Sequence, residues 1–439
     1  MKQVLMISYH FPPNRAPGAL RVGKFAKYLP RFGWHPSVIT PANFYTAAGA
    51  DETPETPPEV DVIRTPNWDW GTMWKRWRGD VSPELKDLRF RLGAVPSANG
   101  FRAWIYRALR WSADNLLFIP DRANLWYFSC LKAARRLLRA RRVRAIFSSS
   151  PFITAHLAAL RFHEETGIPW LADFRDLWTL GAVRYPSRFR ERVDKYLERR
   201  IMESATHLTF ATPPLCNVYR QRYPVLESKS SILTNGYDAE DFCSLQRTRA
   251  DECFRIVYSG SFYQGQRNPE PLLASLDRLM RAGVLDRRKV ELRIVGTVEP
   301  FLPPLLDEYV LRDLTTLTGS VPHRQSLQEM LDADLLWLIT GDFTHPEVFH
   351  STKLFEYLAA GPPILAFSPK NGAAGLLIDE LQAGSVVADA SEQVDACLAH
   401  YYQRHQQQFW SYEPRCNGLE RYERRNLTGQ LAEILDRIT

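Results

Sequence analysis

The sequence predicts an α/β protein with two parallel-sheet domains, and three observations support this prediction. Two segments, residues 4–40 and 254–295, each combine a strand, a loop, a helix and a strand, which is the pattern of a βαβ unit. The chain has 439 residues, too many for one ordinary core. Its composition, 45% hydrophobic and 24% charged, is close to the average of globular proteins.

The first βαβ unit begins with an apolar run at residues 4–8, which predicts a strand. A loop rich in proline follows at 9–18, and a helical pattern covers 19–32. Residues 36–40 predict the second strand. The unit therefore has a Gly/Pro loop at the carboxyl end of its first strand.

The second βαβ unit begins with a predicted strand at 254–258, followed by a loop and by a helix at 269–282 with proline in its first turn. The domain junction is expected in the polar stretch 246–252. An N-terminal domain would then cover residues 1–245 and a C-terminal domain residues 246–439. We expect the last helix to pack back on the N-terminal domain.

An insert at about residues 50–143 separates the first βαβ unit from the rest of its domain. It carries tryptophans among basic residues, for example Trp74 beside Lys75 and Trp104 near Arg102. Such a mixture suits the headgroup region of a membrane, although the tryptophans suit a protein core equally well. The net charge of +7 also favours a polyanionic partner, which could be nucleic acid, an anionic membrane or a phosphorylated substrate.

Targeting signals and metal-binding spacings are both missing from the sequence. No stretch approaches the roughly 20 apolar residues that span a bilayer, and the N-terminus lacks the basic region of a signal peptide. We therefore expect a cytoplasmic protein with peripheral contact to the inner face of an anionic membrane. The six cysteines show no C-x-x-C spacing, so neither a zinc site nor a disulfide framework is expected.

Residues 345–366 are the segment that points most strongly to chemistry. A polar loop enters a predicted helix near Ser351 or Thr352. Backbone N–H groups at this helix start, together with Lys353, predict a cradle for a diphosphate. Glu356 lies about one turn further along and can accept hydrogen bonds from ribose hydroxyls. Taken alone, a Ser/Thr-Lys pair before a helix is most often a surface cap.

Acidic residues also follow a predicted strand in the N-terminal domain. Asp173 and Asp176 come just after the apolar run 169–172, at the carboxyl end of a strand, where α/β proteins form ligand sites. A carboxylate there can orient an acceptor hydroxyl or take its proton. An ion pair with Arg175 is the competing interpretation for Asp176, so Asp173 is the preferred catalytic candidate. His156 is another candidate, although a lone histidine is more often structural.

Residues 345–366 as a whole resemble the donor-binding signature of glycosyltransferase family four. Further segments match the family in order along nearly the whole chain: 8–13 with Gly18 and Arg21, 149–151 with His156, 172–179, 235–238, 258–262 with Arg267, and 319–322. The resemblance implies the GT-B fold, in which two Rossmann-like domains face each other across a cleft, here an acceptor-side domain at residues 1–245 and a donor-nucleotide domain at 246–439. It also implies sugar transfer from a nucleotide-diphosphate donor with retention of anomeric configuration, as in bacterial polysaccharide biosynthesis.

The resemblance implies a set of site residues. The implied donor-binding residues are Gly18, Arg267, Val321, Ser351, Thr352, Lys353 and Glu356, and the catalytic candidates are Asp173, Glu347 and His156. The family signature has two glutamates separated by seven residues, and Glu356 matches the second. Val348 occupies the position of the first, and Glu347 lies one residue out of register. Many members have arginine where this chain has Ser261, which leaves Arg267 as the expected phosphate contact.

These observations together predict a hexosyltransferase that acts on a lipid-linked saccharide acceptor in surface polysaccharide synthesis. Lys353, Arg267 and the helix dipole can stabilise the departing nucleoside diphosphate, so we expect neither a metal nor a cofactor. A nucleotide-sugar epimerase and a non-catalytic sugar-nucleotide-binding protein remain alternatives on the same fold. A basic nucleic-acid-binding protein is less favoured, because no RNP, zinc-finger or helix-turn-helix signature is present.

Overall fold

The structure is a computed structural model of the chain. It describes residues 1–14, 17–42, 59–67, 112, 115, 117–181, 185, 187–249, 252–341, 345–387, 391–407 and 418–439. Most of the predicted insert, including Trp74 and Trp104, lies outside the described residues.

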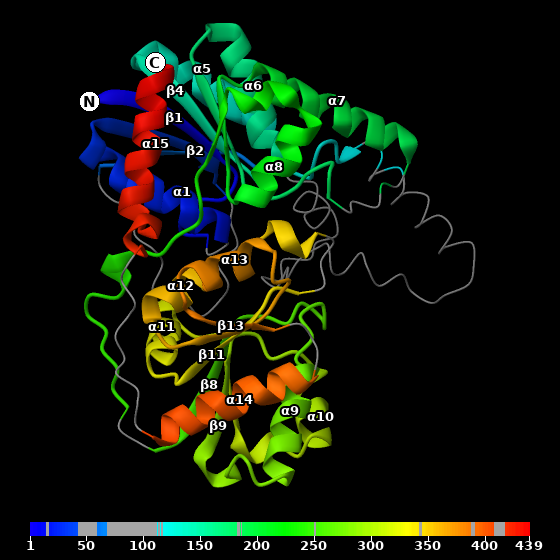
Figure 1. Cartoon of the computed structure of the whole chain (residues 1–439). Helices are drawn as coiled ribbons and strands as arrows, with labels where there is room; N and C mark the ends of the chain where they lie inside the picture. The colour runs from blue at the N-terminus through cyan, green and yellow to red at the C-terminus, as the bar shows by residue number, and fades with distance from the viewer. Residues whose placement is uncertain are drawn as a thin grey trace, which may run out of the picture. The chain divides into compact units, whose positions relative to one another are not determined.

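The chain forms two compact units (Figure 1). Unit 1 comprises Met1–Ala211, Leu215–Leu233 and Thr428–Thr439, and unit 2 comprises Thr212–Pro214 and Thr234–Leu427. The chain thus passes into unit 2 after Leu233, so residues 246–249 lie inside that unit.

Unit 1 contains a sheet of seven parallel strands in the order β3-β2-β1-β4-β5-β6-β7. The strands are β1 (Lys2–Ser8), β2 (Trp34–Pro41), β3 (Asp61–Thr65), β4 (Val143–Ser149), β5 (Trp170–Phe174), β6 (His207–Phe210) and β7 (Ser230–Ile232). Every residue of β5 is buried, as expected for a parallel strand covered on both faces. The strand order reverses between β1 and β4, and α/β proteins place ligands outside the carboxyl ends of strands at such a point.

The helices of unit 1 are α1 (Pro17–Tyr28), α5 (Trp126–Ala140), α6 (Ile153–Thr166), α7 (Arg188–Ser204), α8 (Pro213–Arg222) and α15 (Arg424–Ile438), with short 3-10 helices at Leu29–Phe32 and Pro224–Glu227. Helix α5 packs beside α6, and α6 beside α7. The last helix, drawn in red in Figure 1, lies with β1 and α1. Asp436 accepts hydrogen bonds from Lys2 Nζ at 2.8 Å and from Trp34 Nε1 at 3.1 Å, which ties this helix to the first strands.

Unit 2 contains a sheet of six parallel strands in the order β10-β9-β8-β11-β12-β13. The strands are β8 (Phe254–Ser259), β9 (Val290–Val295), β10 (Thr315–Gly319), β11 (Leu335–Ile339), β12 (Ile364–Phe367) and β13 (Gly384–Val387). Ile256 and Tyr258 belong to one hydrophobic cluster and Val257 to another, because successive side chains of a strand point to opposite faces. The sheet therefore has a core on both faces.

The helices of unit 2 are α9 (Glu270–Arg281), α10 (Leu302–Glu308), α11 (His323–Leu331), α12 (Thr352–Ala360), α13 (Ala373–Glu380) and α14 (Ser391–Gln406). Short 3-10 helices lie at Ala239–Asp241, Arg287–Lys289, Arg312–Leu314, Pro346–Val348 (η7) and Glu420–Tyr422. Both predicted βαβ units are present, and the predicted α/β fold class with two parallel sheets is confirmed. Among the described residues, no helix is long and apolar enough to cross a membrane.

Candidate active site

In unit 2, the loop after β8 brings its backbone against the side chain of Lys353. Gly260 has a φ of 146°, and a Cβ at this position would lie 1.9 Å from Lys353 Nζ. Only glycine accommodates both the conformation and the close approach. Lys353 Nζ donates a hydrogen bond of 2.5 Å to the carbonyl oxygen of Ser259. The ammonium group is therefore held at the carboxyl end of β8.

The surroundings of Lys353 disfavour its positive charge. Burial and, to a smaller extent, the neighbouring charge of Arg267 lower the pKa of Lys353 to about 8, and Glu356 acts in the opposite direction. Arg267 stacks on the ring of Tyr263 at 4.7 Å, and its buried Nε atom has no hydrogen-bond partner among the described residues. Two neighbouring cations of this kind would be stabilised by a bound anion.

The start of α12 lies at the same site. Ser351 is the N-cap of the helix, and its Oγ atom accepts a hydrogen bond of 3.2 Å from the backbone N–H of Lys353. Thr352 is the first helical residue, so the positive end of the helix dipole lies next to the Lys353 side chain. The Ser351 hydroxyl therefore serves as a cap, and the helix end adds to the positive potential.

Glu356 faces a residue that the sequence analysis did not identify. His323, the first residue of α11, places Nε2 at 2.9 Å from Oε1 of Glu356. The Glu356 side chain is 15% exposed and that of His323 45% exposed, so the pair is open to solvent on one side. Val321, expected to border the base, is half-buried just before α11. The position of His323 directly after the matched segment 319–322 was the signal that could have revealed it.

Glu347 lies in η7, where it is half-buried with 46% of its side chain exposed, and its Oε1 atom lies 2.9 Å from Nδ1 of His345. Val348 is buried in the core of unit 2. Burial acts to raise the pKa of Glu347, but hydrogen bonds from its own backbone N–H and from His345 outweigh this and lower it. Val348, which occupies the position of the first glutamate of the family signature, thus packs in the core. Glu347, one residue earlier, presents its carboxylate to solvent.

In unit 1, Asp173 lies at the carboxyl end of β5 and is fully buried. Its carboxylate accepts hydrogen bonds from Arg21 at 2.8 and 3.0 Å, from Ser149 Oγ at 2.7 Å and from Thr209 Oγ1 at 2.8 Å. Burial acts to raise its pKa, but the charge of Arg21 and these hydrogen bonds outweigh it and hold the pKa below its usual value. Both oxygens are therefore engaged inside the protein.

His156 is also fully buried, in α6. Its Nδ1 atom lies 2.8 Å from Ser148 Oγ, and its ring stacks on Phe174 with centroids 4.5 Å apart. Ser148 Oγ accepts a hydrogen bond from Trp170 Nε1 at 2.8 Å. Burial lowers the pKa of His156 to about 3, although the nearby Asp173 charge acts against this shift. The imidazole is therefore neutral and packed between two strands.

Gly18 lies where Arg175 approaches the start of α1. A Cβ at Gly18 would be 2.7 Å from Arg175 Nη1, so a larger residue would displace the guanidinium. The Arg175 Nε atom is buried and has no hydrogen-bond partner among the described residues. Burial and the charge of Arg175 lower the pKa of His10 to about 4. Arg175 is thus the cation of a group at the carboxyl edge of the sheet of unit 1 in which His10 is neutral, and of these three residues the sequence analysis singled out Gly18 as a donor-binding residue.

Comparisons with known proteins concern the family and the fold of the chain. Residues 112–241 match the family model described as Glycosyltransferase Family 4. The whole fold is similar to that of a sucrose-phosphate synthase from Thermosynechococcus elongatus, with a TM-score of 0.63 at 16% identity over 100% of this chain and 99% of that chain. The chain is a glycosyltransferase with the GT-B fold.

Two further solved structures show the same architecture. WaaG, a glycosyltransferase involved in lipopolysaccharide biosynthesis, has a TM-score of 0.59 at 15% identity over 98% of this chain and 99% of that chain. The lipopolysaccharide outer core galactosyltransferase WaaB, in its apo form, has a TM-score of 0.55 at 10% identity over 99% of both chains. No curated protein sequence matches the chain. At these identities the structural likeness shows the fold alone, and the matched family implies a nucleotide-sugar donor.

Proposed function

We propose that this glycosyltransferase transfers a hexosyl residue from a nucleotide-diphosphate sugar to a lipid-linked saccharide in surface polysaccharide synthesis, with retention of anomeric configuration. The observation that carries this proposal is the pair of cations, Lys353 and Arg267, beside the start of α12. Breaking the bond between the anomeric carbon and the β-phosphate oxygen leaves negative charge on the diphosphate. Cations and a helix N-terminus already in place stabilise that charge without reorganisation.

The remaining donor contacts follow from the same geometry. Glu356, one turn beyond Lys353, is proposed to accept hydrogen bonds from the ribose hydroxyls, with His323 orienting its carboxylate. Val321, Ser351 and Thr352 would border the nucleotide. Gly18 and Arg175 of unit 1 are proposed to provide a second contact for the phosphates, because Arg175 is a cation whose Nε has no partner in the described part of unit 1.

The buried positions of Asp173 and His156 favour positioning over direct contact with substrate. Asp173 holds the Arg21 guanidinium through two hydrogen bonds, and Arg21 also donates to the carbonyl oxygen of Leu233 at 2.6 Å. Asp173→Asn would leave the Arg21 charge buried and unbalanced, at a cost of about 3 to 5 kcal/mol of stability. Glu347, which is half-buried on η7, is the carboxylate that we propose for contact with the donor sugar.

The acceptor and the membrane contact have separate support. WaaG is a glycosyltransferase involved in lipopolysaccharide biosynthesis, and by analogy with it we propose that this chain acts in surface polysaccharide synthesis. The net charge of +7 and the tryptophan-rich, basic sequence of the insert favour an anionic membrane as the place where the acceptor is presented.

A panel of UDP- and GDP-sugars tests the donor site, with nucleotide release measured in the presence and absence of acceptor lipid. We expect Lys353→Ala to lower turnover at least about 100-fold and Glu356→Ala to lower kcat/KM about 10- to 100-fold. Lys370→Ala, which removes an exposed lysine of the same unit, is the control and should behave as wild type. Wild-type rates in both site variants would contradict the donor-site assignment. An isomerised nucleotide sugar formed without acceptor would indicate an epimerase instead.

The same assay tests the role of metal ions. Since Lys353, Arg267 and the helix dipole can balance the charge of the leaving diphosphate, we propose that transfer needs no divalent cation. Added EDTA should leave the rate of nucleotide release unchanged. Loss of activity in EDTA that is restored by Mg²⁺ would show that this proposal is wrong.

A further inference from the structure

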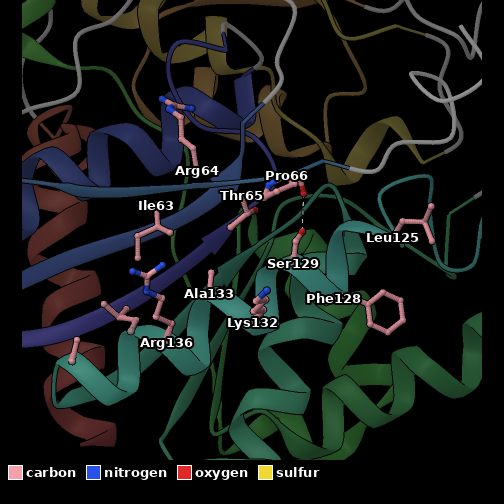
Figure 2. Close-up of a pocket in the computed structure, with 12 residues that line it drawn as sticks. Ile63, Arg64, Thr65, Pro66, Leu125, Phe128, Ser129, Lys132, Ala133 and Arg136 are labelled. Atoms are coloured by element: carbon pink, nitrogen blue, oxygen red, sulfur yellow. Dashed lines mark hydrogen bonds between the residues drawn. The ribbon is translucent and has the colours of Figure 1, made fainter. Parts of the chain in front are cut away.

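Unit 1 carries a groove that the donor site does not use. It lies between β3, the edge strand of the sheet, and helix α5, and has a volume of about 880 Å³. Figure 2 shows Ile63 and Thr65 on the strand side and Ser129, Lys132, Ala133 and Arg136 on the helix side. A volume of this size is within the range of small-molecule sites in proteins.

The lining of this groove is mostly hydrocarbon. Ile63 contributes from β3, and Ala133 and Leu137 contribute from successive turns of α5. Phe128 stands at the helix side and is 69% exposed, although it is a large aromatic residue. Exposed apolar surface that lines a concavity commonly marks a binding site.

Three basic residues accompany this apolar lining, and one of them, Arg64 of β3, donates a hydrogen bond of 2.7 Å to the carbonyl oxygen of Pro12. Lys132 and Arg136 are four residues apart on α5, so they lie on the same side of the helix, and both line the groove. Neither forms an ion pair with any residue in the described part of the chain. Arg135 on the same helix, by contrast, pairs with Glu165 at 2.6 Å. The groove therefore combines apolar walls with positive charge that the described residues do not balance.

We propose that this groove binds an anionic phospholipid of the membrane, with a hydrocarbon chain against Ile63, Ala133 and Leu137 and the phosphate on Lys132 and Arg136. Phe128 would insert among the neighbouring chains. This inference deepens the proposed function, since it rests on an acceptor presented at a membrane. It assigns the membrane contact to α5 and β3, whereas the sequence pointed to the tryptophans of the insert.

The position of the cations along α5 favours a bilayer lipid over the reacting acceptor. Trp126, at the start of the helix, donates a hydrogen bond of 2.7 Å to Thr65 Oγ1 at the carboxyl end of β3. Lys132 and Arg136 lie six and ten residues further on, which places them about 9 and 15 Å along the helix axis from that end. A phosphate held there lies far from the carboxyl edge of the sheet, where the sequence places the acceptor side.

Co-sedimentation of the full chain with vesicles tests this site. Vesicles of phosphatidylglycerol and phosphatidylcholine in equal parts should bind the protein, and pure phosphatidylcholine vesicles should bind it more weakly. The double variant Lys132→Gln, Arg136→Gln should lower partitioning about 30-fold, since it removes two cations from an anionic surface. The control, Arg135→Gln with Arg139→Gln, removes the same charge from the same helix outside the groove. Phe128→Ser should lower partitioning about tenfold, and its control Phe189→Ser on α7 should not.

The outcomes separate this inference from the proposed function. Hydrogen exchange in α5 should slow on vesicle binding in wild type and not in the double variant, and thermal melting shows that each variant is folded. If the control variant of Arg135 and Arg139 loses as much vesicle binding as the variant of Lys132 and Arg136, the protein binds vesicles through its overall positive charge. The groove site is then wrong. If wild type binds no vesicles, the groove holds another occupant, such as a segment of the chain itself, and the inference is also wrong. Nucleotide release from the donor needs no vesicle, so its failure would count against the proposed function alone.

Discussion

Lys353 combines two properties that oppose each other, since it is buried and yet is a cation. Gly260 makes this possible, because its lack of a side chain leaves room for the ammonium group against the backbone of the loop. The nearby Arg267 raises the cost of the Lys353 charge further. A diphosphate bound at this point would offset both costs, so binding free energy is available for the donor and for its departing group.

The lowered pKa of Lys353 predicts how catalysis depends on pH. Because kcat/KM reports ionisations of the free enzyme, it should be constant up to about pH 8, the pKa of Lys353, and then fall about tenfold per pH unit as the ammonium group loses its proton. Lys353→Arg should move this fall above about pH 10, since a guanidinium stays charged there. The measurement is the pH profile of kcat/KM for nucleotide release.

A control variant and a contrary outcome complete the design of this pH experiment. The Lys370→Ala variant should show the wild-type profile, because that lysine is exposed. A fall at the same pH in Lys353→Arg would assign the ionisation to another group and contradict the role of Lys353.

The residues that the sequence did not reveal are those whose partners lie far away in the chain. The position of Asp173 at the end of a strand followed from local pattern, but its pairing with Arg21, 152 residues earlier, did not. His323 faces Glu356 only because α11 and α12 are packed side by side. Contacts between residues so far apart in the chain depend on tertiary structure, and a single sequence carries no direct signal for them.

At the scale of elements, local signals predicted helix α12 closely. The helix was expected to begin near Ser351 or Thr352, and it spans Thr352–Ala360, with Gly361 at a φ of 96° and Pro362 directly after it. Caps and proline act within a few residues, so a sequence shows them directly. The one-residue offset between Glu347 and Val348 was visible too, but only the structure shows that Val348 packs in the core.

The groove between β3 and α5 shows the opposite case. Both elements lie within the segment that was treated as a single insert, and the 60 residues between Thr65 and Trp126 conceal that they are neighbours. Strand β3 has only five residues, and its burial does not alternate, so it has a weak pattern. A site formed by this short strand and a helix far from it in the sequence could not be predicted from periodicity.

At the scale of the whole molecule, the chain begins and ends in the same unit. The sheet of unit 1 is built from residues before 234, yet unit 1 also includes the last residues, Thr428–Thr439. Leu431 and Leu435 of α15 are fully buried. The donor residues of unit 2, in contrast, all lie before this segment. Folding of unit 1 therefore depends on the end of the chain, and the donor residues of unit 2 do not.

Truncation after Leu427 tests this division. Removing the buried Leu431 and Leu435 should cost about 2 kcal/mol each, and losing the rest of the packed helix should cost more, which is a large part of the stability of a typical domain. Calorimetry should then show a lost or lowered transition for unit 1, while titration with UDP and GDP should still show nucleotide binding to unit 2, weakened by the loss of the proposed phosphate contacts of Gly18 and Arg175. Asp436→Ala, which removes only the hydrogen bonds to Lys2 and Trp34, should have a small effect. Two unchanged transitions after truncation, or loss of nucleotide binding together with unit 1, would contradict the independence of the donor site.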